Sequence, residues 1–174
     1  LRRKRKVEQI AIYPGSFDPV TNGHLDIIQR SSKIFEKVVV AVFCNPFKDP
    51  MFTMEERVEM LEEATKDFDN VTIDAFEGLL VDYAKQEGAQ VIVRGIRAVS
   101  DFEGEFQKAS MNKKLEPEIE TLILMSSNEH AFLSSSAVKE AALFGGCIKG
   151  LVPPNVQQMV VKRVKEYKDK KLSK

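Results

Sequence analysis

Short apolar runs alternate with helix-like segments along this chain, and this alternation constrains the fold more than any other feature. Five runs have the length and composition of buried strands: Ile10–Tyr13, Val38–Phe43, Val71–Phe76, Val91–Arg94 and Leu122–Met125. Helix-period segments lie between and after them: 22–35, 54–68, 79–86, 100–114, 134–144 and 155–167. Strict alternation favours right-handed βαβ units. We therefore predict a doubly wound α/β fold around a five-stranded parallel sheet.

Local signals indicate where two of these helices begin. Thr53 with Glu56 has the spacing of a capping box ahead of the second helical segment, and Ser100 with Glu103 has the same spacing ahead of the fourth. In such a box, the two side chains bond each other's backbone N–H groups. We therefore expect side-chain caps at both helix starts.

Charge is distributed unevenly although the net charge is zero. Residues 7–161 carry 14 basic and 24 acidic residues, whereas both ends are basic. An acidic domain is a poor general nucleic-acid binder, because nucleic acids require a positive surface. No apolar run approaches the ~18 residues of a membrane span. We predict one domain over residues 1–174, with basic tails at 1–6 and 168–174, and neither a nucleic-acid nor a membrane partner.

The cysteine pattern bears on the compartment. Cys44 and Cys147 stand alone, without the spacing of a metal site. Two isolated thiols are more often buried and reduced than joined in a disulfide or bound to metal. This pattern favours a cytoplasmic location.

The loop after the first predicted strand, residues 13–24, has the features of an anion site. In a doubly wound sheet the ligand lies at the carboxyl ends of the strands. Gly15 and Gly23 allow close backbone approach, and His24 falls in the first turn of the next helix, where N–H groups and the positive dipole end lie. The loop matches neither G-x-G-x-x-G nor the P-loop. A helix-capping turn with a surface histidine is the alternative, but the flanking residues favour phosphate binding.

Four segments of the chain resemble a known family. The 13–24 loop is similar to the H/T-x-G-H signature of the nucleotidyltransferase superfamily related to class I aminoacyl-tRNA synthetases, with Thr21 in the first signature position. Residues 45–57 and 94–112 agree in order, and residues 132–140 resemble the second signature, I-S-S-S-x-V-K-E. Together they resemble bacterial phosphopantetheine adenylyltransferases over about residues 9–165. This resemblance implies a Rossmann-like nucleotidyltransferase fold.

The resemblance also implies a reaction. The family transfers the adenylyl group of ATP to 4′-phosphopantetheine, giving dephospho-coenzyme A and pyrophosphate in coenzyme A biosynthesis. The attacking phosphate is already anionic, so positioning and electrostatic stabilisation suffice. His24 resembles the catalytic residue that stabilises the transition state. Mg²⁺ is expected to arrive with ATP rather than in a protein cage. A homohexamer and feedback binding of coenzyme A are further implications.

Two sets of binding residues follow from the resemblance. The ATP set is Ser16, Phe17, His24, Gly95, Ile96, Arg97, Glu105, His130, Ala131, Phe132, Leu133, Ser134, Ser135 and Ser136. The acceptor set is Ser16, Lys48, Leu80, Arg94 and Asn112. A guanidinium pairs with two oxygens of one phosphate, and serines at a helix start offer hydroxyl and N–H donors.

Several of these residues have plainer interpretations when taken alone. Lys48 could be a solvated surface lysine, Leu80 a core residue, and Arg94 and Arg97 members of surface ion pairs. The serines at 134–136 could form an ordinary helix cap. Whether His130, shortly before them, contacts adenine or phosphate stays open. Asp18 in the signature-like loop could hold that loop by bonding backbone N–H groups.

Two other functions stay open. One is an adenylyltransferase or cytidylyltransferase of the same fold with another phosphate-bearing acceptor, such as nicotinamide mononucleotide. Those enzymes commonly carry His in the first signature position and Arg at the end of the second, whereas Thr21 and Lys139 stand here. The other is a catalytically silent nucleotide-binding module. Loss of the signature histidine or of the basic phosphate ligands would favour it, and these residues are present.

Overall fold

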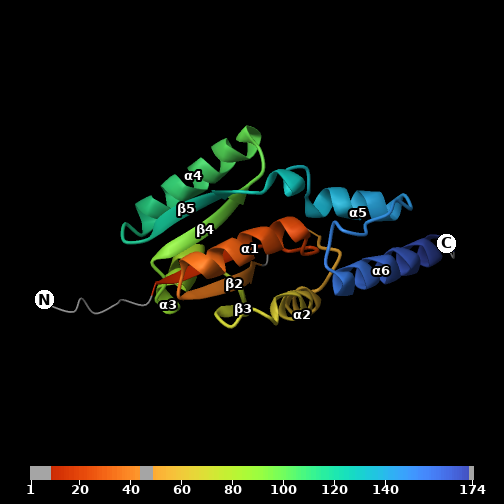
Figure 1. Cartoon of the computed structure of the whole chain (residues 1–174), viewed down its shortest axis with the longest axis horizontal. Helices are drawn as coiled ribbons and strands as arrows, with labels where there is room; N and C mark the ends of the chain where they lie inside the picture. The colour runs from red at the N-terminus through yellow and green to blue at the C-terminus, as the bar shows by residue number, and fades with distance from the viewer. Residues whose placement is uncertain (1–8, 44–48, 173–174) are drawn as a thin grey trace, which may run out of the picture.

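The computed structural model describes residues 9–43 and 49–172, which form a central parallel sheet with flanking helices (Figure 1). The strands are β1 (Ile10–Gly15), β2 (Lys37–Phe43), β3 (Val71–Phe76), β4 (Val91–Ile96) and β5 (Glu120–Met125). Their order is β3-β2-β1-β4-β5, and every neighbouring pair is parallel. The predicted doubly wound α/β fold with a five-stranded sheet is confirmed.

Helices cover both faces of this sheet and extend past one end of it. They are α1 (Asn22–Ile34), α2 (Met54–Thr65), α3 (Leu80–Gln86), α4 (Val99–Leu115), the 3₁₀ turn η1 (Asn128–His130), α5 (Ser135–Leu143) and α6 (Pro154–Leu172). Ala11 and Val38 pack in the core beneath α1, α2, α5 and α6, whereas Ile12 and Val39 pack in a second core with α3. Successive strand residues point to opposite faces, so the continuous apolar runs of β1 and β2 serve both cores.

The sheet order reverses at β1. The chain leaves β1 towards β2 and β3, then returns to pair β4 with the other edge of β1. The carboxyl ends of parallel strands share one edge of the sheet, so the loops after β1 and β4 separate there and leave a crevice. The fold thus places the signature-like loop beside the end of β4, which carries Arg94, and the turn after it, which carries Arg97.

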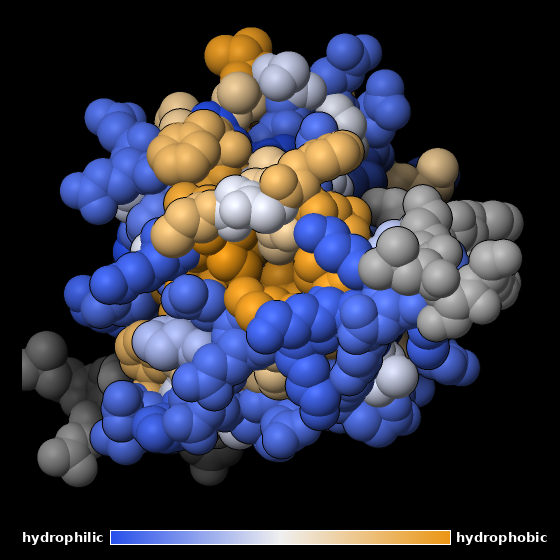
Figure 2. Space-filling model, turned by 90° about the vertical axis from the view of Figure 1, so that its right-hand side faces the viewer, coloured by the Kyte–Doolittle hydropathy of each residue, from blue (hydrophilic) through white to orange (hydrophobic). Residues whose placement is uncertain are grey.

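Helices α5 and α6 lie beyond the carboxyl ends of the strands (Figure 1). Val138 and Ala142 of α5 pack in the same core as Val156, Val160 and Val164 of α6. Figure 2, which views this side of the molecule, shows apolar side chains gathered in a hollow, with polar residues below it and further apolar residues above it. The two helices therefore extend the first core past the sheet and bring the start of α5 close to the loop after β1.

Two sequence-based expectations for helix starts had different outcomes. The box at α2 is confirmed, because the N–H of Thr53 donates to Glu56 Oε2 at 2.8 Å and the N–H of Glu56 donates to Thr53 Oγ1 at 3.3 Å. The box predicted at Ser100 is wrong, since α4 begins at Val99 after Ala98 without a side-chain cap bond. Asp101 replaces it: its carboxylate accepts the N–H of Arg97.

The remaining features concern the chain ends and the thiols. Helix α6 continues to Leu172, so residues 168–172 of the predicted tail are helical. Cys147 is a free thiol as expected, but it is exposed rather than buried. Cys44 and the predicted tail at 1–6 lie outside the described residues. None of the described helices combines the length and apolar character needed to cross a membrane.

Candidate functional site

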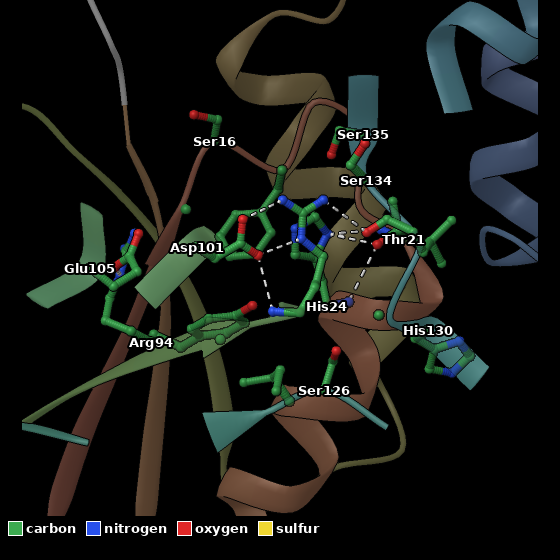
Figure 3. A pocket seen from close by; sticks show the side chains of 18 of the residues that line it. Ser16, Thr21, His24, Arg94, Asp101, Glu105, Ser126, His130, Ser134 and Ser135 are labelled. Carbon is green, nitrogen blue, oxygen red and sulfur yellow. Dashed lines mark hydrogen bonds and ion pairs between the residues drawn. The ribbon is translucent and has the colours of Figure 1, made fainter. Parts of the chain in front are cut away.

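A cavity of about 520 Å³ opens at the carboxyl ends of β1 and β4 (Figure 3). Its lining comes from the loop after β1 with the start of α1, the end of β4 with the start of α4, Ser126 after β5, and the connection from η1 to α5. This is the edge of the sheet where the strand order reverses. The volume lies in the range of small-molecule sites, about 300–1,000 Å³.

Most of the residues predicted to bind a ligand line this cavity, although they come from segments far apart in sequence. They are Ser16, Phe17, His24, Arg94, Gly95, Arg97, Glu105, His130, Leu133, Ser134 and Ser135. In Figure 3, Thr21 and His24 lie on one side of the cavity, and Arg94 and Glu105 lie on the other. The fold therefore gathers parts of three of the four signature-like segments around one space.

Other predicted residues are not part of the lining. Ile96 is buried, whereas Ala131, Phe132 and Ser136 are exposed on the η1–α5 side. On the acceptor side, Leu80 packs against the second core and Asn112 lies on α4 away from the cavity wall. Lys48 lies outside the described residues. The binding roles of these residues stay predictions.

The lining also contains residues outside the two predicted binding sets, although Gly15 and Gly23 among them were expected to let a ligand approach the backbone. These are Tyr13, Pro14, Gly15, Thr21, Gly23, Ile27, Ser100, Asp101, Gly104, Lys108 and Ser126. Two of them had a readable signal. Asp101 follows Arg97 at i,i+4 spacing at the start of a helix, and Ser126 directly follows the last strand of the sheet.

The loop after β1 is built around the ring of Phe17. This residue has a φ of 47° in the left-handed region, which costs a residue with a side chain about 1–2 kcal/mol. Burial of the ring, which is 2% exposed, offsets this cost by a similar amount, about 1.5–3 kcal/mol. A Cβ on Gly15 would lie 2.8 Å from Cζ of Phe17. Gly15 therefore makes room for this ring, and its predicted role in ligand approach stays a prediction.

His24 is held as a neutral hydrogen-bond donor. The N–H of Thr21 donates to Nδ1 of His24 at 3.0 Å, which leaves the ring proton on Nε2. In return, Oγ1 of Thr21 accepts the N–H of His24 at 3.3 Å and completes a capping box for α1. Burial, aided by the charge of Arg97, lowers the pKa of His24 to about 4. At neutral pH the ring is therefore uncharged and has one N–H to offer.

Arg94 is paired with a carboxylate of α4. Its Nε and Nη2 donate to the two oxygens of Glu105 at 2.5 and 2.9 Å, and Nη1 donates to the carbonyl of Pro14 at 3.0 Å. Lys108 donates to the same carboxylate at 2.8 Å. Burial alone would raise the pKa of Glu105, but the hydrogen bonds and charges of Arg94 and Lys108 outweigh it and lower that pKa. A phosphate reaching Arg94 must compete with Glu105.

Arg97, in the turn between β4 and α4, is likewise paired with a carboxylate of α4, that of Asp101 one turn before Glu105. Its Nε donates to Asp101 at 3.0 Å and its Nη1 to the carbonyl of Leu133 at 3.3 Å. The hydrogen bond from Arg97 is the main cause that lowers the pKa of the Asp101 carboxyl. Arg97 thus joins α4 to the segment before α5, and its positive charge is paired with the carboxylate of Asp101.

The serine run at the start of α5 forms hydrogen bonds within the protein. The hydroxyl of Ser134 accepts the N–H of Ala137 at 3.0 Å, and that of Ser135 donates to the carbonyl of Pro19 at 2.8 Å. Both hydroxyls therefore serve the protein structure while the residues border the cavity. The first turn of α5 faces the cavity with its N–H end, which favours an anion.

Metal ligands do not gather at the site. Within residues 9–43 and 49–172, no group of three or more His, Cys, Asp or Glu side chains could hold a metal ion. The carboxylates that line the cavity, Asp101 and Glu105, are bonded to arginines.

Comparisons with known proteins first define a class. The cytidylyltransferase-like family model matches residues 12–141. A solved structure described as a putative nicotinate-nucleotide adenylyltransferase from Vibrio parahaemolyticus superposes with a TM-score of 0.68 at 18% identity, covering 91% of this chain and 95% of that one. A nicotinic acid mononucleotide adenylyltransferase from Plasmodium falciparum, complexed with NaAD, gives 0.66 at 16% identity, covering 92% and 96%. The fold is that of the nucleotidyltransferases.

Curated relatives narrow this class. Phosphopantetheine adenylyltransferase of Carboxydothermus hydrogenoformans is 58% identical over 149 residues, covering 86% of this chain and 92% of the relative. The enzymes of the same name from Clostridium kluyveri and Dictyoglomus turgidum are 56% and 59% identical, covering 91% and 89% of this chain and 98% and 97% of the relatives. The chain belongs to the phosphopantetheine adenylyltransferase family, as its motifs indicated.

Proposed function

We propose that this protein transfers the adenylyl group of ATP to 4′-phosphopantetheine, giving dephospho-coenzyme A and pyrophosphate, a step of coenzyme A biosynthesis. The observation that carries the proposal is the position of His24. Its neutral ring has one N–H to donate, at a helix start that borders a cavity also lined by Arg94 and Arg97. Curated relatives at 53–59% identity that bear the enzyme's name support it.

The reaction needs no nucleophile from the protein. An oxygen of the acceptor phosphate attacks the α-phosphorus of ATP, a new P–O bond forms, and the bond to the β-phosphate breaks with release of pyrophosphate. Charge on the oxygens of the α-phosphate grows in the transition state. A donor already in place stabilises that charge without reorganisation, and Nε2–H of His24 is such a donor. Its proton stays on the ring throughout.

The two sides of the cavity are assigned to the two substrates. We place the ATP phosphates against the starts of α1 and α5, within reach of Arg97, because these helix ends offer N–H groups and positive dipole ends. The acceptor phosphate lies towards Ser16 and Arg94, with Lys48 as a further ligand. On binding, each phosphate takes over hydrogen bonds that Asp101 and Glu105 now accept from the arginines.

Mg²⁺ fits this assignment only as a companion of ATP. No group of three or more His, Cys, Asp or Glu side chains among the described residues could hold a metal ion, so phosphate oxygens and water would supply most of its ligands. When bound, the ion neutralises charge on the leaving pyrophosphate. Arg97 and the first turn of α5 hold the phosphates that carry it.

We further propose a homohexamer that works in the cytoplasm and is subject to feedback by coenzyme A. Exposed apolar side chains on α4 and at the end of β5 support self-association: Phe102, Phe106, Met111, Leu115 and Met125. Light scattering after gel filtration tests the assembly, and competition of coenzyme A with 4′-phosphopantetheine tests the feedback.

One experiment tests the function itself. Purified protein is incubated with Mg²⁺ and ATP, together with 4′-phosphopantetheine in one tube and nicotinamide mononucleotide in another, and pyrophosphate release is measured. We expect release with 4′-phosphopantetheine alone. Release with the mononucleotide instead would show that 4′-phosphopantetheine is the wrong acceptor. If folded protein releases no pyrophosphate in either tube, a nucleotide-binding module without activity would be favoured.

A further inference from the structure

Lys139 belongs to the second signature-like segment and is not part of the cavity lining. Its side chain reaches the buried carboxylate of Asp18 in the first signature-like segment, the loop after β1. Its Nζ lies 2.6 Å from Oδ2 of Asp18, a residue that is 6% exposed. The same carboxylate accepts the N–H of Met51 at 3.0 Å and the N–H of Phe52 at 2.9 Å. Asp18 therefore bonds backbone N–H groups as the sequence suggested, but in a segment more than thirty residues away. Three remote segments meet at one side chain.

The segments that meet there serve the two halves of the proposed site. Helix α5 carries Lys139 and begins with Ser134 and Ser135, which border the cavity on the side assigned to ATP. A second bond, from Ser135 to the carbonyl of Pro19, joins α5 to the same loop. On the acceptor side, residues 51–52 come shortly after the predicted phosphate ligand Lys48.

The 51–52 segment is also fixed from behind. Arg163 of α6 donates to the carbonyl of Met51, and its guanidinium lies 4.9 Å from the centre of the buried Phe52 ring. A peptide held between Asp18 and Arg163 transmits a movement of the carboxylate instead of absorbing it. The carboxylate also depends on its lysine, because two amide N–H groups do not neutralise a buried charge.

We propose that Asp18 and Lys139 are positioning residues that hold the ATP-side start of α5 and the acceptor-side segment before α2 at a fixed separation. Occupation of one half of the site then raises the affinity of the other, and by linkage the effect is reciprocal. This inference rests on the proposed function. Neither residue lines the cavity; Lys139 acts through the start of α5, and Asp18 acts through Met51 and Phe52.

The test compares three variants with the wild-type enzyme. Lys139→Met keeps the apolar stem and removes the charge, and Lys139→Arg keeps the charge. Lys85→Met is the matched control, since Lys85 forms an ion pair of equal length, 2.6 Å, with Glu116 away from the cavity. Calorimetry measures the affinity for 4′-phosphopantetheine with and without α,β-methylene-ATP, which cannot be cleaved, and turnover is measured on the same preparations.

We expect the ATP analogue to tighten binding of 4′-phosphopantetheine to the wild type. Lys139→Met should lose most of this enhancement and about tenfold in kcat, whereas Lys139→Arg and Lys85→Met should keep both. If Lys139→Met does not fold, Lys139→Gln, which keeps a donor without the charge, replaces it in the same comparison.

Two results would overturn the inference: a wild type in which the analogue leaves the affinity unchanged, or a folded Lys139→Met that keeps the full enhancement. A wild type that shows the enhancement but releases no pyrophosphate would count against the proposed function and not against the coupling, because the enhancement is measured without turnover.

Discussion

The two walls of the cavity differ in how they are built. The wall formed by the loop after β1 and the start of α1 is well packed, because Phe17 and Thr21 are only 2% and 1% exposed. Thr21 and His24 also form hydrogen bonds with each other. The opposite wall, α4, has a single buried residue, Glu105, and meets the cavity with carboxylates bonded to Arg94 and Arg97. One wall is rigid before a ligand arrives, and the other is held by bonds that a ligand can take over.

This difference indicates a division of labour. A donor fixed by its own wall stabilises a transition state without reorganisation, so its loss should appear in kcat. An arginine already bonded to a carboxylate contributes to binding only the difference in free energy between its bonds to the ligand and its bonds to that carboxylate. Removing such an arginine should therefore have a smaller effect, which appears in KM. The predictions below break one wall or the other.

The largest expected effect comes from His24→Ala, which removes the donor of the rigid wall. We expect kcat to fall at least about a hundredfold, or ~2.7 kcal/mol, because the lost interaction strengthens in the transition state. The KM for ATP should change only modestly, and the fold should persist. Steady-state kinetics with pyrophosphate detection measure both constants. Near-normal turnover in this variant would remove His24 from the catalytic role.

The pH dependence of stability is the second test of the rigid wall. His24 has a pKa of about 4 in the folded protein, below its usual 6.5. Between these values the unfolded chain binds a proton that the folded protein excludes, so stability falls as the pH falls from 6.5 towards 4. We expect this to cost about 2–3 kcal/mol, somewhat less than the full shift implies because the ring keeps contact with the cavity.

Urea unfolding of wild type and His24→Gln at pH 7 and pH 4.5 measures this effect. The lowered pKa values of Asp26, Asp101 and Glu105 add stability at neutral pH that is lost only as the pH falls below 4.5, the usual pKa of a Glu carboxyl. The loss of stability between pH 7 and pH 4.5 is therefore due largely to His24. Equal losses in wild type and variant between the two pH values would contradict the assignment.

The two walls also differed in how far the sequence revealed them. The loop after β1 is contiguous and carries a signature, so His24 and its helix start were placed correctly. Asp101, which holds Arg97, escaped notice because the Ser100–Glu103 spacing suggested a capping box at that place. The contact of the Phe17 ring with Gly15 was not predicted, since no local pattern shows that the ring folds back onto this glycine. Contacts between remote segments, such as Asp18 with Phe52, have no sequence periodicity.

The third prediction compares one glycine from each wall. Gly15→Ala places a Cβ 2.8 Å from the Phe17 ring and should destabilise the protein by about 2 kcal/mol, because the closed loop must move. Gly104→Ala on α4 meets no atom within 4 Å and should stabilise the helix by about 0.5–1 kcal/mol. Urea unfolding at pH 7 measures both. Equal changes in the two variants would mean that the walls do not differ in packing.

The smallest expected effect comes from the exchangeable wall. Arg94→Met should raise the KM for 4′-phosphopantetheine about tenfold, or ~1.4 kcal/mol, with a smaller change in kcat. The effect is moderate because the phosphate must displace Glu105 from Arg94, so only the difference between the two partners is lost. Lys66→Met, which breaks an exposed ion pair with Glu63 on α2, is the control and should leave both constants unchanged.

A companion variant sharpens this last test. Glu105→Gln keeps the shape of the side chain but weakens its hold on Arg94, which frees the guanidinium for the acceptor phosphate. The KM for 4′-phosphopantetheine should therefore fall, by about threefold, while Arg94→Met raises it. Because Glu105 is also a predicted ATP ligand, the KM for ATP is measured alongside. Changes of KM for the acceptor in the same direction in both variants would show that the carboxylate supports Arg94 rather than competing for it, and the two walls would then both be fixed in advance.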